Sequence, residues 1–113
     1  MKDDLAIALD VLEHARRARE YAAGHTLETF LTTRGVQDST FWCFQVMGEA
    51  AKRLSAEFCE QHPEVDWSGI ARFRDRLIHG YHRIDYELCW SIIHEQLPRT
   101  VSALEKIVPP PKS

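Results

Sequence analysis

The chain has 113 residues, of which 44% are hydrophobic and 27% are charged, a composition typical of a folded domain rather than a disordered chain. Its longest apolar stretch, residues 5–9, has only five residues, whereas a membrane-spanning helix needs roughly 20. A net charge of −3 argues against a protein that coats nucleic acid by bulk electrostatics, and no apolar leader follows Met1. We therefore expect one cytoplasmic domain over residues 1–108 and a flexible proline-rich tail over 109–113.

The first half of the chain predicts helices. Apolar residues at helical spacing (5, 8, 9, 12, 15, 18 and 22) favour a helix over residues 3–23 that stops at Gly24. Thr26 is a suitable N-cap for a short helix over residues 27–33, with Gly35 ending it. Asp38 or Ser39 then caps a long helix that runs to about Gln61, because Pro63 disfavours helical backbone before it. A heptad-like seam marks its buried side: Phe44, Met47, Ala51, Leu54 and Phe58.

The second half predicts two further helices. Asp66 caps a helix over residues 67–79 that Gly80 ends, and Asp85 caps the last helix, with a kink at Pro98. The buried side of the last helix comprises Ile93, Leu97, Val101, Leu104 and Val108. The expected fold is an all-α, up-and-down bundle of four main helices plus a short one. Surplus aromatic surface around Phe41, Trp42 and Trp90 favours a homodimer.

Positive charge is concentrated in one segment. Four arginines (72, 74, 76 and 83) and a single acid give residues 72–83 a net +3, while the other residues, with 10 basic and 16 acidic side chains, carry −6. Such a segment suits a small anionic target such as a phosphate. It also fits a solvated helix face whose arginines pair with neighbouring acids.

Two residue pairs in this segment could carry chemistry. Asp75 and His79 lie four apart on one helix face, so the carboxylate could orient the imidazole. Arg74 and His79 lie five apart, about 140° around a regular helix, and converge only if the helix distorts near Gly80 or a second copy supplies the partner. Tyr81 could project its hydroxyl beside His79. A histidine that moves protons and an arginine that holds phosphate oxygens suit phosphodiester cleavage without a metal, although a histidine near a helix end is more often a cap or a packing residue.

No metal or cofactor is expected from the remaining residues. The three cysteines form no Cys-x-x-Cys pair, and the histidines have no metal-ligand spacing. Cys43, Cys59 and Cys89 are predicted as small core residues, and Trp42, Trp67 and Trp90 as core or interface residues rather than base-stacking platforms. Gly48, in mid-helix, is expected to permit close helix contact.

Several segments together resemble the HepT-like branch of the HEPN-domain ribonuclease toxins. Arg74, His79 and Tyr81 match the Arg-x4-His-x-Tyr motif of that family, and Asp75 fills the polar position after the arginine. Residues 48–52 read Gly-Glu-Ala-Ala-Lys and residues 62–67 read His-Pro-Glu-Val-Asp-Trp, as in that branch. Ile84-Asp85, Trp90 and Leu97-Pro98 also fall where the branch has an aliphatic-Asp pair, a Trp and a Leu-Pro. The resemblance covers residues 5–108.

The resemblance implies the toxin of a type II or type VII toxin–antitoxin system. It would be an all-α homodimer that cleaves RNA, not DNA, without a metal, with Arg74 and His79 catalytic and Asp75 supporting. It also implies an antitoxin partner, a minimal nucleotidyltransferase that can transfer AMP to the motif tyrosine, here Tyr81. Such a modification would place an anion and bulk in the phosphate-binding cleft.

Other roles and functions stay open. Three arginines could contact RNA phosphates or acidic residues of the antitoxin: Arg72, Arg76 and Arg83. Glu49 could pair with an arginine of the basic segment and position it, or be a plain surface carboxylate. The chain could also be a non-catalytic HEPN subunit that presents a nucleotide or substrate to a nucleotidyltransferase, or a structural dimer with no ligand.

Overall fold

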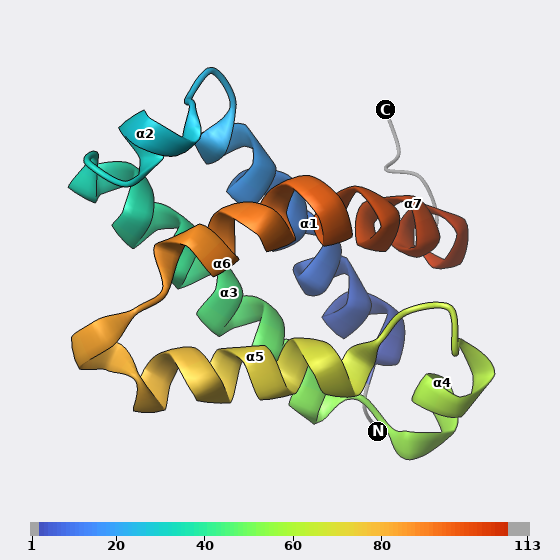
Figure 1. Cartoon of the computed structure of the whole chain (residues 1–113). Coiled ribbons are helices and arrows are strands. Elements are labelled where there is room, and N and C mark those ends of the chain that lie inside the picture. Colours follow the sequence, from blue (N-terminus) through green and yellow to red (C-terminus); the bar gives the residue numbers. More distant parts are fainter. Residues whose placement is uncertain (1–2, 109–113) are drawn as a thin grey trace.

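A computed structural model describes residues 3–108, and every regular element in that range is helical (Figure 1). The helices are α1 (Asp4–Ala22), α2 (Leu27–Phe30), α3 (Arg34–Arg53), α4 (Ala56–Gln61), α5 (Trp67–His79), α6 (Tyr86–Ser91) and α7 (Leu97–Ile107). A 3₁₀ turn (Tyr81–Arg83) follows α5, and a π-helical turn (Ile92–Gln96) joins α6 to α7. The tail predicted over residues 109–113 lies outside the described residues.

The long helices run up and down, as Figure 1 shows. Helix α3 lies between α1 and α5 and makes the most extensive contacts with both, and α7 packs on α1. The all-α prediction is confirmed, with two short helices, α2 and α4, where one was expected. The cap predictions at Thr26 and Asp66 are also confirmed, because each side chain accepts a hydrogen bond from a backbone N–H of the first turn.

The two predicted buried stripes form much of the core. All five residues of the seam from Phe44 to Phe58 are buried, as are all five predicted on the last helix. Helix α1 differs from the prediction, because Leu5 and Leu9 are exposed, while Ile7 and Val11 are buried in their place. Cys43 and Cys89 are buried as expected, whereas Cys59 is only partly so.

The predicted helix from Asp38 or Ser39 to Gln61 is wrong at its start and in its middle. Helix α3 begins at Arg34, so Gly35 lies inside it and does not end α2. The chain then turns extended at Leu54, and Ser55 caps a separate helix, α4. The carboxylate of Asp4 accepts hydrogen bonds from both the backbone N–H (3.0 Å) and the hydroxyl (2.8 Å) of Ser55. A contact 51 residues away along the chain therefore stabilises the break.

Where a kink at Pro98 was expected, the chain forms the π-helical turn just before it. The N–H of Leu97 donates to the carbonyl of Ile92, five residues back. Pro98 has no N–H to donate to the carbonyl of His94, and its ring would clash with that carbonyl in a regular helix. A wider turn relieves this clash while α6 and α7 continue as one rod (Figure 1).

Candidate active site

Helix α5 carries the Arg74 to His79 motif, with the bounds that the sequence predicts. The Asp66 carboxylate accepts a hydrogen bond from the N–H of Gly69 at 3.0 Å, and the N–H of Gly80 closes the helix on the carbonyl of Arg76 at 2.9 Å. The backbone is therefore helical from one motif residue to the other. The position of each side chain depends on what α5 packs against.

Arg74 lies against α3 at Gly48. A Cβ atom built on Gly48 would stand 2.1 Å from the Cβ and 2.5 Å from the Cγ of Arg74, and 3.3 Å from the carbonyl oxygen of Ile70. Only a glycine leaves room for the base of the arginine side chain at this crossing. The expected close helix contact is thus present, and it holds Arg74 itself.

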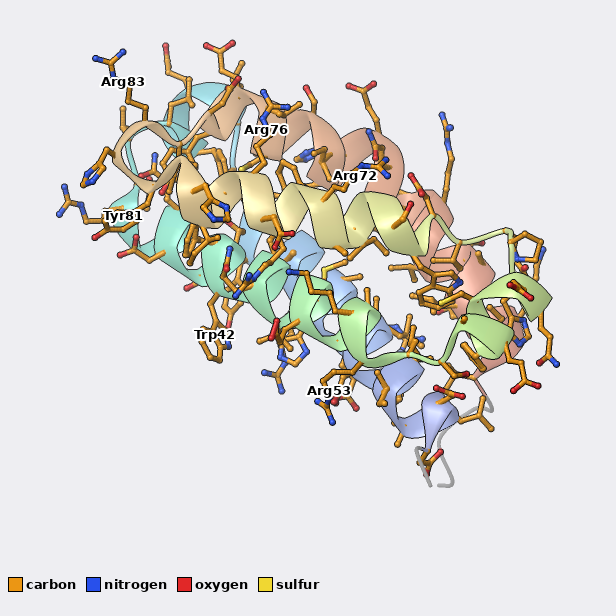
Figure 2. The ribbon with its side chains drawn as sticks, turned by 90° about the horizontal axis from the view of Figure 1, so that it is seen from below. Trp42, Arg53, Arg72, Arg76, Tyr81 and Arg83 are labelled. Carbon is orange, nitrogen blue, oxygen red and sulfur yellow. The ribbon has the colours of Figure 1, made fainter. Side chains whose placement is uncertain are left out.

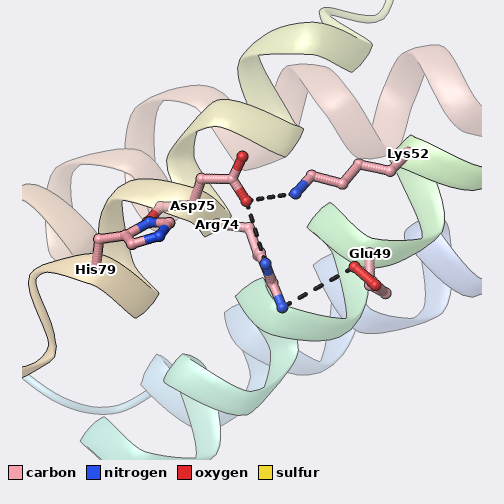
Figure 3. Close-up of polar contacts among 5 residues, drawn as sticks. All are labelled: Glu49, Lys52, Arg74, Asp75 and His79. Atoms are coloured by element: carbon pink, nitrogen blue, oxygen red, sulfur yellow. Dashed lines mark hydrogen bonds and ion pairs between the residues drawn. The ribbon is translucent and has the colours of Figure 1, made fainter.

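Two carboxylates engage the guanidinium of Arg74 (Figure 3). Its Nη1 donates to Asp75 Oδ1 at 3.1 Å, and its Nη2 lies 3.9 Å from Glu49 Oε1. The Arg74 side chain is only 24% exposed, and its Nε is buried with no hydrogen-bond partner among residues 3–108. Glu49 was expected either to pair with an arginine of the basic segment or to be a plain surface carboxylate, and its ion pair with Arg74 favours the first role. Arg74 is therefore held in place before any ligand binds.

Asp75 pairs with cations rather than with the catalytic candidate His79. Its Oδ1 accepts a hydrogen bond from Lys52 Nζ at 2.5 Å as well as from Arg74. The hydrogen bond from Lys52, followed by that from Arg74, lowers the pKa of the Asp75 carboxyl below its usual value. Lys52 was not predicted as a site residue, although it ends the Gly-Glu-Ala-Ala-Lys segment, one turn of α3 beyond Gly48.

The predicted carboxylate–imidazole contact of Asp75 and His79 is therefore wrong. The Nδ1 of His79 donates instead to the backbone carbonyl of Asp75 at 2.7 Å, which leaves Nε2 facing outward on an exposed side chain. His14 and His94 make the same bond four residues back on their own helices, at 2.8 and 2.9 Å. This bond is thus a local property of helical histidines and does not single out His79.

The two motif residues do not meet within the chain. Among the contacts of residues 3–108, no hydrogen bond or ion pair links Arg74 to His79, and α5 stays regular up to its cap. The expected placement of Tyr81 beside His79 also finds no contact to support it. The Tyr81 ring instead packs on that of His82, at a centroid distance of 5.3 Å, and 64% of the residue is exposed.

Of the remaining arginines, Arg72 and Arg76 lie on another side of α5, and Arg83 lies in the 3₁₀ turn after it. Arg72 and Arg76 project from the edge of α5 away from Trp42 and Arg53, as Figure 2 shows. Arg72 Nη1 donates to Ser68 Oγ at 3.0 Å, and Arg72, Arg76 and Arg83 are all exposed. The basic segment is therefore split, with Arg74 turned toward α3 and the other three facing solvent.

The described part of the chain, residues 3–108, contains neither a cluster of metal-ligating side chains nor a membrane-spanning helix. No three His, Cys, Asp or Glu side chains lie close enough together there to hold a metal ion. No helix in this range is both long and apolar enough to cross a membrane.

Comparison with known proteins points to one family. The family model described as Ribonuclease HepT-like matches residues 11–107. "Putative RNase MJ0127" of Methanocaldococcus jannaschii is 35% identical over 107 residues, covering 95% of this chain and 88% of its own. "Probable ribonuclease HepT" of Thermococcus cleftensis is 30% identical over 105 residues, covering 93% of this chain and 90% of its own. No solved structure matches the chain.

Proposed function

Because the chain belongs to the HepT-like ribonuclease family, we propose that it is a toxin endoribonuclease that cleaves RNA without a metal ion. The observation that supports this proposal most strongly is the way in which Arg74 is fixed by its packing at Gly48 and by its ion pairs. A guanidinium held by Glu49 and Asp75, at a helix crossing where only a glycine leaves room for it, is a preorganised phosphate ligand.

Cleavage requires three things of the site. The 2′-hydroxyl of the RNA loses a proton, its oxygen attacks the adjacent phosphorus, and the leaving 5′-oxygen gains a proton. The Nε2 of His79 is free for such a proton transfer, since Nδ1 is occupied by the carbonyl of Asp75. Arg74 would hold the phosphate oxygens on which negative charge builds, while Asp75 and Glu49 keep its side chain in place.

The absence of a hydrogen bond or ion pair between Arg74 and His79 within residues 3–108 favours a composite site in a homodimer. Arg74 and His79 face different surroundings within one chain, so a second copy could bring its own His79 or Arg74 to complete the pair. Apolar exposure near His79 supports such an interface, because Ile78, the residue before it on α5, is 40% exposed. Two motifs would then line one cleft.

The partner of this toxin would be an antitoxin, a minimal nucleotidyltransferase. Its action would be the attack of the Tyr81 hydroxyl oxygen on the α-phosphorus of ATP, which forms a tyrosyl–AMP ester, releases pyrophosphate and frees the hydroxyl proton. The exposure of Tyr81 makes its hydroxyl accessible for this reaction. The added anion would compete with RNA for the nearby arginines.

A second candidate function also follows from the missing contact between Arg74 and His79 within residues 3–108. A non-catalytic subunit that binds a nucleotide for a partner nucleotidyltransferase needs the anchored Arg74 but no proton transfer by His79. The two functions differ in what the loss of the imidazole does.

The test is RNA cleavage by the purified protein in EDTA, with His79→Ala as the variant. His14→Ala is a matched control, since it removes an imidazole with the same local hydrogen bond from another helix. Cleavage by the parent and by His14→Ala, with none by folded His79→Ala, is the expected result. Equal cleavage by all three proteins would remove His79 from catalysis. Absence of cleavage in all three, with nucleotide binding retained, would favour the binding subunit.

A further inference from the structure

The carboxylate of Asp75 is shared by two cations from different helices. Its Oδ1 accepts a hydrogen bond from Lys52 Nζ of α3 at 2.5 Å and another from Arg74 Nη1 of α5 at 3.1 Å. Figure 3 shows the ammonium and the guanidinium meeting at this one oxygen. The hydrogen bond from Lys52 is the first cause of the lowered pKa of the Asp75 carboxyl, ahead of that from Arg74. Lys52 therefore balances much of the negative charge that Asp75 places beside Arg74.

The charges around the Arg74 guanidinium are balanced only when Lys52 is counted. Glu49 and Asp75 bring two negative charges, and Arg74 itself supplies one positive charge. Lys52 supplies the second positive charge. The cavity beside Arg74 adds one acid and one base, which leave the balance unchanged: Asp10 and Arg53. Without Lys52, two carboxylates would face one guanidinium, and the group would repel a phosphate.

The position of Lys52 follows from the helix crossing that fixes Arg74. Lys52 lies one turn beyond Gly48 on α3, so the close approach of α5 at Gly48 also brings Asp75 within its reach. Within residues 3–108, Asp75 is the one polar partner of the Lys52 side chain. Both side chains are 39% exposed, and ion pairs at such positions add little to stability. The pair is therefore better explained by its effect on the charge of the site.

We propose that Lys52 is a positioning residue of the ribonuclease site, which keeps Arg74 available to an RNA phosphate by balancing the charge of Asp75; this inference rests on the proposed function. With Lys52 in place, Asp75 orients the guanidinium without cancelling its charge. Lys52 acts through Asp75 in this role and does not touch the RNA. Its loss leaves an excess of negative charge at the group that binds the phosphate.

Loss of the lysine charge is the first test. In the His79→Ala background, which prevents cleavage under the proposed function, fluorescence anisotropy measures the affinity for a labelled single-stranded RNA of mixed sequence. Lys52→Met keeps the length of the side chain but removes its charge, so binding should weaken about 10-fold at low salt. Lys106→Met removes the same charge from an exposed position of α7 and should bind as the background does.

Restoring the balance is the second test. Adding Asp75→Asn to Lys52→Met removes the excess negative charge but keeps an amide oxygen that can accept from Arg74, so binding should return to within about 2-fold of the background. Lys52→Arg keeps the charge and should need no rescue. The loss in Lys52→Met should also shrink between about 0.05 M and 0.5 M salt, because salt screens the unbalanced charge. A merely structural role would give neither the rescue nor this salt dependence.

Three results would overturn the role of Lys52. One is equal binding by Lys52→Met and the background. Another is a loss that Asp75→Asn does not restore, which would make Lys52 a direct ligand of the RNA or a structural residue. The third is weaker binding that accompanies unfolding in circular dichroism or a change of assembly in sedimentation.

Cleavage by the parent protein in EDTA keeps this inference separate from the proposed function. If the parent cleaves no RNA, while Lys52→Met loses binding and Asp75→Asn restores it, the proposed function fails and the charge-balancing role stands. If the parent cleaves RNA and Lys52→Met binds it normally, the role of Lys52 fails and the proposed function stands.

Discussion

The two motif residues of α5 have opposite environments. Arg74 is mostly buried against α3 and engaged by two carboxylates, while His79, five residues later, is exposed and bonded only to the backbone of its own helix. The folded chain alone therefore positions the proposed phosphate ligand, Arg74, and leaves the proposed proton carrier, His79, exposed to solvent. If cleavage needs both groups at one phosphate, a second molecule must bring them together. That molecule is either another copy of the chain or the bound substrate.

The largest expected effect comes from removing the anchored cation. Arg74→Ala should lower the rate of RNA cleavage by about 10²–10³-fold, as the loss of one preorganised charge-stabilising donor does elsewhere. Arg99→Ala, an exposed arginine of α7, is the control and should cleave at the parental rate. Single-turnover cleavage of a labelled RNA measures both. If Arg74→Ala cleaved RNA at the parental rate, Arg74 would have only a structural role.

The second effect concerns the helix crossing that holds Arg74. Gly48→Ala should lower the free energy of unfolding by about 1–3 kcal/mol, because the new methyl group overlaps the Arg74 side chain. Gly35→Ala, in the same helix, meets nothing within 4 Å and should stabilise the protein by up to about 1 kcal/mol. Urea denaturation measures both, and equal midpoints for the two variants would contradict the close contact.

Cysteine alkylation reports whether Gly48→Ala loosens the bundle. Burial raises the pKa of the Cys43 thiol to about 11 and that of Cys89 to about 12, so both remain protonated and shielded at pH 8. In the parent, iodoacetamide should modify them far more slowly than the partly exposed Cys59. Faster alkylation of Cys43 in Gly48→Ala would show that the substitution disturbs packing beyond Arg74.

The third effect is a pH dependence at Asp75. Lys52 and Arg74 lower the pKa of the Asp75 carboxyl in the folded state. The ionised carboxylate therefore stabilises the folded protein, and this contribution is fully present at pH values above the ordinary carboxyl pKa of about 3.9. That contribution is lost as the pH falls through the lowered folded value. The difference in unfolding free energy between the parent and Asp75→Asn should be constant from pH 7 to 5 and shrink below about pH 4. A difference that grows on acidification would contradict the ion pairs.

The smallest effect on stability is expected at the exposed end of α5. Tyr81→Phe should change the free energy of unfolding by less than about 0.5 kcal/mol, because the residue is mostly exposed. Under the proposed function, it should also abolish the transfer of AMP by the antitoxin, which intact-mass spectrometry measures. Retained modification of Tyr81→Phe would place the acceptor elsewhere.

Much of the fold follows from local signals in the sequence. Asp66 and Gly80 bound α5 because the cap hydrogen bonds involve only residues within one turn. The buried seam from Phe44 to Phe58 could be read from its spacing, even though the chain breaks between Leu54 and Ser55. That break could not be predicted, because the carboxylate that stabilises it comes from Asp4, on another helix.

The sequence by itself determined the helical class, the caps and bounds of α5, and the motif in which His79 follows Arg74 by five residues. Those features depend on periodicity and on bonds within one turn of helix. Only the tertiary structure decided that Gly48 leaves room for Arg74 and that Lys52 and Arg74 together engage the Asp75 carboxylate. These contacts join α3 to α5 or line the space between them, so they depend on how two distant segments cross, which no local pattern specifies.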